Sequence, residues 1–307
     1  MHLLVESQGD AAGRAAALGP HLAIISRPGL FARLEPRLRP LGVPIVYWAH
    51  DLHFVRLGLQ ARFHSRLAAG APQAMRLVEA QCFTRADLAV LPTSDETVRA
   101  RVEFPGARVV ATPYFAMPDQ PLPAGPPVGE RIVFVGGEHH GPNRDGVEWF
   151  LDAVWPGIRD RSPQAELVVV GRWHRARPWP SGVHYSGVIA EAELDALLRS
   201  ARVGIAPLRF GAGMKRKTLH YLSHGLPVVG TGFAVEGLET DESGSVAGVL
   251  LAETVREWES AIGSLADPDL WMRLSRSGHH YVQEAFSMQA FRHGLASVLS
   301  EANRVSD

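Results

Sequence analysis

The chain has 307 residues, a formal net charge of −1, 46% hydrophobic residues and 21% charged residues. This length exceeds what one hydrophobic core usually supports, so we expect two domains, and the composition excludes a largely disordered protein. A net charge so close to zero gives no attraction to nucleic acid, which we do not expect as a partner.

Cysteine content and hydropathy bear on the cellular location. Cys82 is the single cysteine and cannot form an intramolecular disulfide, and the opening residues MHLLVESQGD lack the basic start and apolar run of a secretion signal. The sequence has no stretch of about 18 apolar residues that could span a bilayer. We therefore expect a cytoplasmic protein and leave open a peripheral contact with the inner face of a membrane or with a partner subunit.

The first part of the chain contains short apolar runs separated by helical patterns. These runs are HLAIISRP (21–28), PIVYWAHD (44–51), DLAVLPTS (87–94) and RVVATPY (108–114). Strands alternating with helices indicate a parallel sheet covered by helices. The runs are fewer than a complete doubly wound domain has, so we predict a truncated Rossmann-like N-terminal domain over residues 1–127.

A proline-rich segment separates this domain from the next. Residues 113–130, PYFAMPDQPLPAGPPVGE, contain six prolines and no apolar periodicity, which is typical of an interdomain linker. We place the second domain at residues 128–286. The end of the chain indicates two helices that meet near Phe286 and Ser287, and we expect the last one, residues 287–307, to cross back onto the first domain.

The second domain has the stronger strand pattern. Its apolar runs are RIVFVGG (131–137), ELVVVGR (166–172), VHYSGVI (183–189), VGIAPLR (203–209), LPVVGT (226–231) and GVLLAE (248–253). Amphipathic helical segments such as DGVEWFLDAVWPGI and AELDALLRSA lie between them. This alternation predicts a Rossmann-like domain with strands buried on both faces.

Lysine is confined to one place in the chain. Of the 31 basic residues, Lys215 and Lys217 are the only lysines, and both follow a glycine-rich turn. Their position at the start of a predicted helix, Lys215 to His224, opposes the helix dipole at a cost of about 0.3–1 kcal/mol each. A phosphate or diphosphate offsets that cost, so we favour an anion site over solvated surface charge. Lys217 aligns with His220, Tyr221 and His224 at helical spacing, which predicts a polar stripe.

The segment APLRFGAGMKRKTLHYLSHGLPVVGTGFAVEGL resembles the nucleotide-binding signature of GT-B glycosyltransferases of family 4, also called glycosyltransferase group 1. YWAHDLHFVR (47–56) is similar to the histidine-containing segment in the N-terminal domain of that family. RIVFVGGEHHGPNRDGVEWFLDAVWP and LVVVGR follow in the order of the family. The resemblance covers nearly all of residues 44 to 280.

The resemblance implies two Rossmann-like domains facing across a cleft. The second would bind a nucleoside-diphosphate sugar, and the first would bind an acceptor, which is a glycan, a lipid-linked molecule, a protein or a small molecule. Family members typically transfer the sugar with retention of anomeric configuration and use neither a metal nor another cofactor.

The resemblance also implies roles for individual residues. Lys217 and Arg209 would act on the diphosphate together with Lys215, and His50 would lie near the transferred sugar, so the predicted catalytic residues are His50, Lys217 and Arg209. The predicted donor-binding residues are Gly136, Gly137, Asn143, Gly171, Val188, Gly211, Gly213, Lys215 and His220. Among these, Gly136 and Gly137 would approach the phosphates, and Val188 would meet the base through its backbone.

Two substitutions depart from the family pattern. His220 and Ala212 stand where the family usually has acidic residues that hold the ribose and the sugar. Imidazole still hydrogen-bonds a hydroxyl. The departures keep open a second hypothesis, a catalytically silent nucleotide-sugar-binding subunit that scaffolds or regulates a partner transferase. An epimerase is disfavoured because the chain offers no clear set of acid and base carboxylates.

Other candidate motifs have structural explanations. His50 has an equally good role in the turn after its strand, supported by Asp51. Asp267 and Asp269 match a metal motif superficially, but their place before LWMRLSRSG predicts a helix start. The adjacent histidine pairs lack a third ligand at convincing spacing, so no metal site is predicted.

Overall fold

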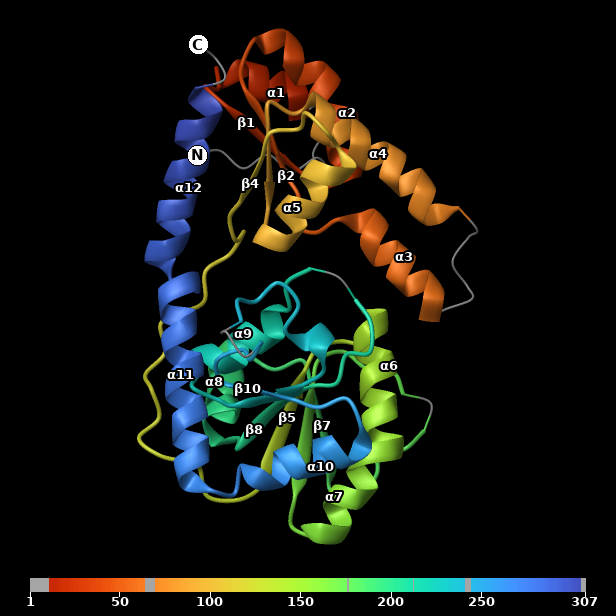
Figure 1. Ribbon diagram of the computed structural model, residues 1–307, viewed down its shortest axis with the longest axis vertical. Helices are drawn as coiled ribbons and strands as arrows, with labels where there is room; N and C mark the ends of the chain where they lie inside the picture. Colours follow the sequence, from red (N-terminus) through yellow and green to blue (C-terminus); the bar gives the residue numbers. More distant parts are fainter. Residues whose placement is uncertain (1–10, 64–69, 176, 212, 241–243, 305–307) are drawn as a thin grey trace. The chain divides into compact units, whose positions relative to one another are not determined.

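The computed structural model describes residues 11–63, 70–175, 177–211, 213–240 and 244–304. The chain divides into two compact units. The first comprises Met1–Phe115, Ala212–Met214 and Gln289–Asp307, and the second comprises Ala116–Gly211 and Lys215–Met288. Each unit contains one parallel sheet with helices packed on it (Figure 1), which confirms the predicted α/β class with two Rossmann-like domains.

The first unit has a four-stranded parallel sheet in the order β1-β2-β3-β4. The strands are β1 (Ala23–Ser26), β2 (Ile45–Trp48), β3 (Leu88–Leu91) and β4 (Val109–Ala111). The helices are α1 (Ala11–Ala17), α2 (Pro28–Leu38), the 3-10 turn η2 (Arg39–Leu41), α3 (His53–Phe63), α4 (Ala71–Arg85), α5 (Ser94–Glu103) and α12 (Met288–Asn303).

Both faces of this sheet are buried, because successive side chains of a strand point to opposite sides. Ile45 and Tyr47 pack into the core under α2 and α4. Their neighbours Val46 and Trp48 pack into a second core with Val298 of α12. The last helix of the chain thus completes the first unit, although it lies far from it in the sequence.

The second unit has a six-stranded parallel sheet in the order β10-β9-β8-β5-β6-β7. Its strands are β5 (Arg131–Val135), β6 (Glu166–Val170), β7 (Val183–Gly187), β8 (Val203–Ala206), β9 (Val228–Gly230) and β10 (Val249–Leu251). The chain winds outward from β5 to β7 and then restarts at β8 on the other side of β5. The carboxyl ends of β5 and β8 therefore form the topological switch point at which open α/β sheets bind ligands.

The helices of the second unit surround a core rich in tryptophan. They are α6 (Gly141–Trp149), the π-helical turn η3 (Phe150–Val154), α7 (Trp155–Arg161), α8 (Glu191–Ser200), α9 (Arg216–Ser223), the 3-10 turn η4 (Gly232–Ala234), α10 (Val255–Ser264) and α11 (Pro268–Phe286). Pro156 explains η3, because it has no N–H to donate to the carbonyl of Asp152 and widens the helix there. The core includes the buried rings of Trp155, Trp258 and Trp271.

The ends of α11 match the sequence prediction. Asp267 caps its first turn and accepts the N–H of Asp269 at 2.9 Å, which confirms a helix start at this place. The helix ends at Phe286, and α12 begins at Met288. The Phe286 carbonyl accepts the N–H of Met117 at 2.8 Å, so part of the proline-rich segment packs back onto the second unit.

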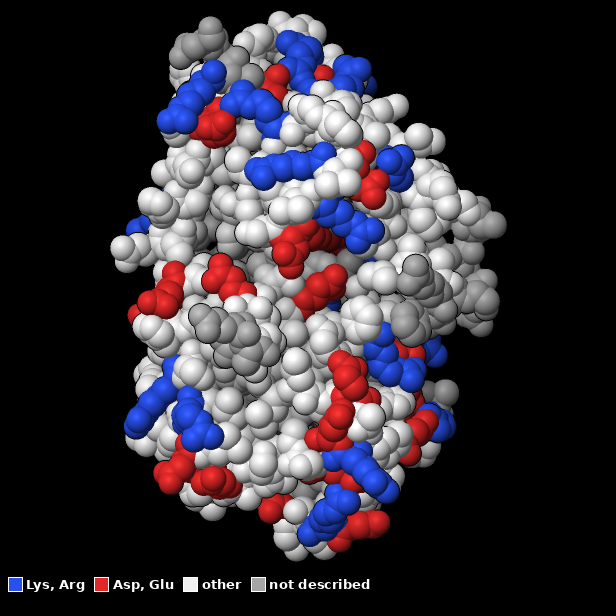
Figure 2. All heavy atoms as spheres, in the orientation of Figure 1, with Lys and Arg blue, Asp and Glu red and all other residues white. Residues whose placement is uncertain are grey.

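Within the described ranges, every helix is too short or too polar to cross a membrane. On the face shown in Figure 2, basic and acidic side chains are interspersed.

Candidate functional site

Three predicted glycines bring the loops after β5 and β6 into backbone contact. A Cβ on Gly171 (φ 128°) would lie 2.5 Å from the carbonyl oxygen of Gly136, and a Cβ on Gly136 (φ 154°) would lie 2.6 Å from Nδ2 of Asn143. Real Cβ atoms essentially never approach other atoms so closely, so both positions require glycine. A Cβ on Gly137 would lie 2.8 Å from the His139 ring. These glycines stand at the carboxyl edge of the sheet, where backbone amides can approach a phosphate.

Lys217 lies against this glycine turn. Its ammonium donates a hydrogen bond to Oδ1 of Asn143 and lies 4.2 Å from the centre of the Phe134 ring. Asn143 is fixed in turn, because its Nδ2 donates to the carbonyl of Gly137 at 3.0 Å. Burial, followed by repulsion from Lys215, lowers the pKa of Lys217 to about 7. In the part of the chain that the structure describes, no carboxylate forms an ion pair with this ammonium. The structure thus shows a lysine ammonium that has no carboxylate partner among the described residues.

Lys215 has a different environment, although it is only two residues away. It occupies the N-cap position of α9, its side chain is 8% exposed, and its ammonium lies 3.0 Å from Oε2 of Glu236. A Cβ on Gly211 (φ 144°) would lie 3.6 Å from that ammonium, and Gly213 (φ 75°) also has a backbone that favours glycine. Gly211 thus lies beside the ammonium of Lys215, whose charge is balanced by Glu236.

Arg209 is held by a helix of the same unit. Its guanidinium forms two bonds with the carboxylate of Asp145, at 2.8 and 2.6 Å, and lies 5.8 Å from the centre of the Trp149 ring. Both partners belong to α6. The sequence predicted that this cation surrounds a diphosphate, and the structure shows it engaged with Asp145.

Val188 directly follows the edge strand β7 and is 72% exposed, so its side chain has no place in the core. Its predicted contact with a base stays a prediction.

His220 is directed toward helix α8 and the end of α9. Its ring lies 5.0 Å from the ring of His224, and these two histidines form a close group with Asp195. Burial, followed by repulsion from His224, lowers the pKa of His220 to about 4. The His220 side chain thus already has partners in Asp195 and His224, and its predicted contact with a ribose stays a prediction.

Tyr221 fixes helix α9 on the sheet, a role that the sequence analysis missed. Its ring occupies the space above Gly204 of β8, where a Cβ would lie 2.5 Å from the ring. Its hydroxyl accepts the N–H of Val135 at 2.7 Å, and Thr218 donates to the carbonyl of Ala234 at 2.7 Å. Tyr221 is fully buried, so the expected polar stripe along α9 is wrong at this position. The pairing of a small residue in one strand with an aromatic residue in the next helix was the available signal.

The His50 segment lies in the first unit, at the carboxyl end of β2. The His50 ring stacks on Tyr114 at 4.7 Å, and burial, followed by the nearby Arg27, lowers its pKa. Asp51, which the sequence suggested as the support of His50, is instead paired with His53 at 2.9 Å and with Arg56 at 2.8 Å. These contacts define the positions of the side chains in the segment. Catalysis by His50 stays a prediction.

Buried Glu79 fixes the start of α3 beyond this segment. Its carboxylate accepts the backbone N–H groups of His53 and Phe54, each at 2.9 Å. The two carboxylates of Asp51 and Glu79 raise the pKa of His53 to about 9, against the opposing effect of burial.

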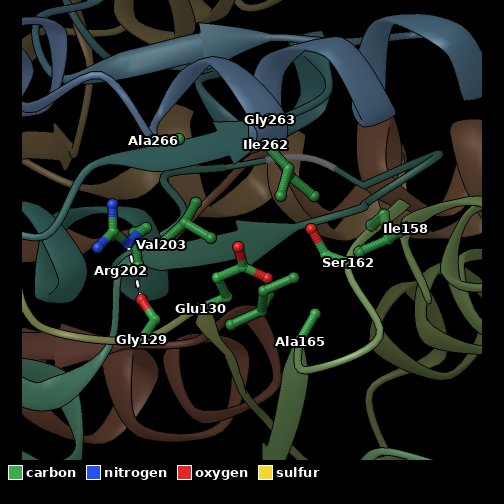
Figure 3. Close-up of a pocket in the computed structure, with 11 residues that line it drawn as sticks. Gly129, Glu130, Ile158, Ser162, Ala165, Arg202, Val203, Ile262, Gly263 and Ala266 are labelled. Carbon is green, nitrogen blue, oxygen red and sulfur yellow. Dashed lines mark hydrogen bonds between the residues drawn. The ribbon is translucent and has the colours of Figure 1, made fainter. Parts of the chain in front are cut away.

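A separate cavity of about 290 Å³ lies at the opposite end of the second sheet (Figure 3). It is lined by residues at the amino ends of β5 and β8, including Glu130 and Arg202, and Arg202 donates to the Gly129 carbonyl at 2.8 Å. Ligands of open parallel sheets bind at the carboxyl ends, so this cavity is not the expected donor site.

Two parallel sheets with helices on their faces, and a glycine–lysine site at a switch point, are the features of the GT-B glycosyltransferase fold. Residues 129–267 match the family described as "Glycosyl transferases group 1". The resemblance noted in the sequence is confirmed by this match, which includes the glycine turn and both lysines. No curated protein matches the chain.

Solved structures agree with this fold. TarM is similar with a TM-score of 0.73 and 10% identity over 95% of this chain and 57% of TarM. Sucrose-phosphate synthase from Thermosynechococcus elongatus is similar with a TM-score of 0.71 and 18% identity over 94% of this chain and 75% of that chain. Anabaena HepE in complex with UDP-glucose is similar with a TM-score of 0.67 and 12% identity over 97% of this chain and 84% of HepE. The chain thus spans little more than half the length of TarM.

Proposed function

We propose that the chain binds a nucleoside-diphosphate sugar at the carboxyl edge of the second sheet and transfers the sugar to an acceptor. The observation that carries this proposal is the buried ammonium of Lys217 beside the Gly136–Gly137 backbone, with no carboxylate partner among the described residues. A buried charge is stable only when it is compensated. A diphosphate supplies that compensation and accepts hydrogen bonds from loop amides at the same time.

The same geometry favours the departure of a nucleoside diphosphate. As the bond between the sugar carbon and the phosphate oxygen breaks, negative charge grows on the leaving oxygen. A fixed ammonium stabilises this charge more strongly in the transition state than in the bound donor. Lys217, whose pKa in the protein without ligand is about 7, gains a proton readily when an anion arrives.

We further propose that the reaction proceeds with retention and without a metal. The leaving phosphate oxygen takes the proton of the acceptor hydroxyl on the same face of the sugar, where the new bond forms. This route needs neither a dedicated base nor a metal ion to balance the leaving charge. Lys215 contributes through the field of its ammonium, which Glu236 holds in place.

UDP is the first ligand to test, because HepE was crystallised in complex with UDP and with UDP-glucose. We keep the acceptor as a glycan, a lipid-linked molecule, a protein or a small molecule. We also propose a cytoplasmic location with a peripheral membrane or partner-subunit contact.

The experiment measures nucleoside diphosphate release by the purified chain from a panel of sugar donors, together with calorimetric binding of UDP. We expect release from one donor class and its loss in the Lys215→Ala, Lys217→Ala double variant. Arg131→Ala is a matched control, because Arg131 forms a partly exposed pair with Glu166 at the amino end of β5. Unchanged release by the double variant excludes the proposed phosphate contact.

A silent nucleotide-sugar-binding subunit is a second candidate. The position where the family usually has a glutamate holds His220, which the structure places with His224 and Asp195. This candidate predicts UDP binding with no turnover for the isolated chain and turnover after addition of a partner transferase. Turnover by the isolated chain excludes it.

A further inference from the structure

Asp195, His220 and His224 form a compact group in the second unit. Asp195 lies on α8, and the two histidines lie at the end of α9. One potential ligand atom of each residue lies within 4.8 Å of the others. The side chain of His224 is fully buried and that of Asp195 is 20% exposed, so the group is largely shielded from bulk water.

The two histidine rings are already placed for a shared ion. They are four residues apart at the end of one helix, so they project from the same face. Their ring centres lie 5.0 Å apart with an interplanar angle of 71°. Two imidazoles bound to one zinc ion, with Zn–N distances of about 2.0–2.1 Å and a tetrahedral angle, have ring centres roughly 5 Å apart. The separation of the ring centres is therefore compatible with a chelate.

The hydrogen bonds of His224 define which ring nitrogen is available. Its Nδ1 lies 2.9 Å from the His220 carbonyl oxygen, which can only accept, so Nδ1 carries a hydrogen. Its Nε2 lies 2.9 Å from Oδ1 of Asp195. Nε2 and a carboxylate oxygen thus face each other, and in the tautomer with its only hydrogen on Nδ1 both atoms present lone pairs. A metal ion between the two atoms removes this conflict, and an Nδ1–H bound to a backbone carbonyl is the usual support of a metal-ligating histidine.

Asp195 is also oriented by neighbours. Its Oδ2 lies 3.4 Å from Nε2 of Gln120 and 3.9 Å from the Arg199 guanidinium. Gln120 is fixed because Arg199 donates to its side-chain oxygen at 2.7 Å and His279 donates to its carbonyl at 2.7 Å. These contacts occupy one carboxylate oxygen and leave the other directed at His224.

We propose that Asp195, His220 and His224 bind one divalent transition-metal ion, with zinc as the favoured metal. Zinc accepts a set of two imidazole nitrogens and one carboxylate oxygen, whereas magnesium and calcium prefer ligand sets made of oxygen alone. A water molecule completes four-coordination. The ion ties α8 to the end of the helix that carries Lys217, so its role is structural, and it takes no part in the transfer step proposed above.

The first test measures metal binding by the chelator-stripped protein. We expect one equivalent of Zn²⁺ in equilibrium dialysis, a rise of several degrees in the thermal unfolding midpoint on addition of Zn²⁺, and a tetrahedral visible spectrum with Co²⁺. Asp195→Asn and His220→Gln keep the size of the side chains, and each should weaken binding by about 100-fold or more. His280→Gln is the matched control, because His280 is exposed on α11 and pairs only with Glu284 among the described residues.

The outcome also separates this proposal from the donor site. Failure to bind one equivalent of Zn²⁺, or equal binding by the Asp195→Asn and control variants, overturns the metal site and leaves a direct contact between His224 and Asp195. Circular dichroism shows whether each variant is folded. Binding of UDP by the Asp195→Asn variant tests the proposed function independently, because Asp195 is not one of the predicted donor-binding residues, whereas His220 belongs to both sets.

Discussion

Replacement of Lys217 by methionine separates the binding role of this side chain from any structural role. Methionine keeps the length of the side chain and its contact with Phe134 but removes the ammonium. A hydrogen bond to a charged group contributes about 1.5–3 kcal/mol, so the Kd for UDP should rise roughly 10- to 150-fold. Arg216→Met is the matched control, because it removes the same charge from the exposed neighbouring position of α9.

The same substitution should also change the stability of the folded protein in a predictable direction. Burial lowers the pKa of Lys217 to about 7 from its ordinary value of 10.5, so the folded state disfavours the charged form. The charged Lys217 therefore lowers the free energy of unfolding by its full amount below pH 7. This loss of stability decreases as the pH rises from 7 toward 10.5, where the unfolded chain also loses the proton. Lys217→Met should therefore unfold at the same or a higher denaturant concentration than the parent at pH 6, with the difference shrinking above pH 7.

Calorimetry with UDP and urea unfolding at pH 6 and pH 9 measure both effects. An affinity within about twofold of the parent, or an equal loss in Arg216→Met, refutes the phosphate contact. A marked loss of stability at pH 6 refutes the reasoning on the buried charge, because it shows that the ammonium stabilises the protein without ligand.

Further predictions concern the same unit. The affinity of the parent for UDP should fall as the pH rises above about 7, because the protonated form of Lys217 binds the diphosphate, and calorimetry should find that this dependence is lost in Lys217→Met. Gly171→Ala places a Cβ 2.5 Å from a backbone oxygen at φ 128°, so urea unfolding should show a free energy of unfolding that is lower by about 1–3 kcal/mol or more. Gly263→Ala is the control, because this position on α10 faces open space, and the substitution should be neutral or stabilising. Tyr221→Phe leaves the Val135 N–H without its 2.7 Å acceptor and should cost about 1–3 kcal/mol in the same assay; no loss would show that another acceptor replaces the hydroxyl.

The sequence alone was sufficient to locate the strands, and it also predicts the anion site. Runs such as RIVFVGG and LPVVGT are apolar on both faces, which only a sheet covered on both sides accommodates, and they became β5 and β9. The lysines were informative because they occur together behind glycines and nowhere else in the chain. Both signals are local in the sequence, so they can be recognised without knowledge of the fold.

The partners of the charged side chains were decided only by the tertiary structure. Arg209 pairs with Asp145, 64 residues away, and Asp195 meets His224 across 29 residues. Whether Lys217 or Lys215 keeps its charge unpaired depends on where Glu236 comes to lie. Side chains far apart in the sequence meet only after the sheet has fixed the order of its strands and the helices have packed on it. The position of α9, for example, depends on the packing of the Tyr221 ring against Gly204. The sequence thus determined the strands of the second unit and placed its only lysines behind a glycine-rich turn, and the packing of helices on the sheet decided which side chains those lysines meet.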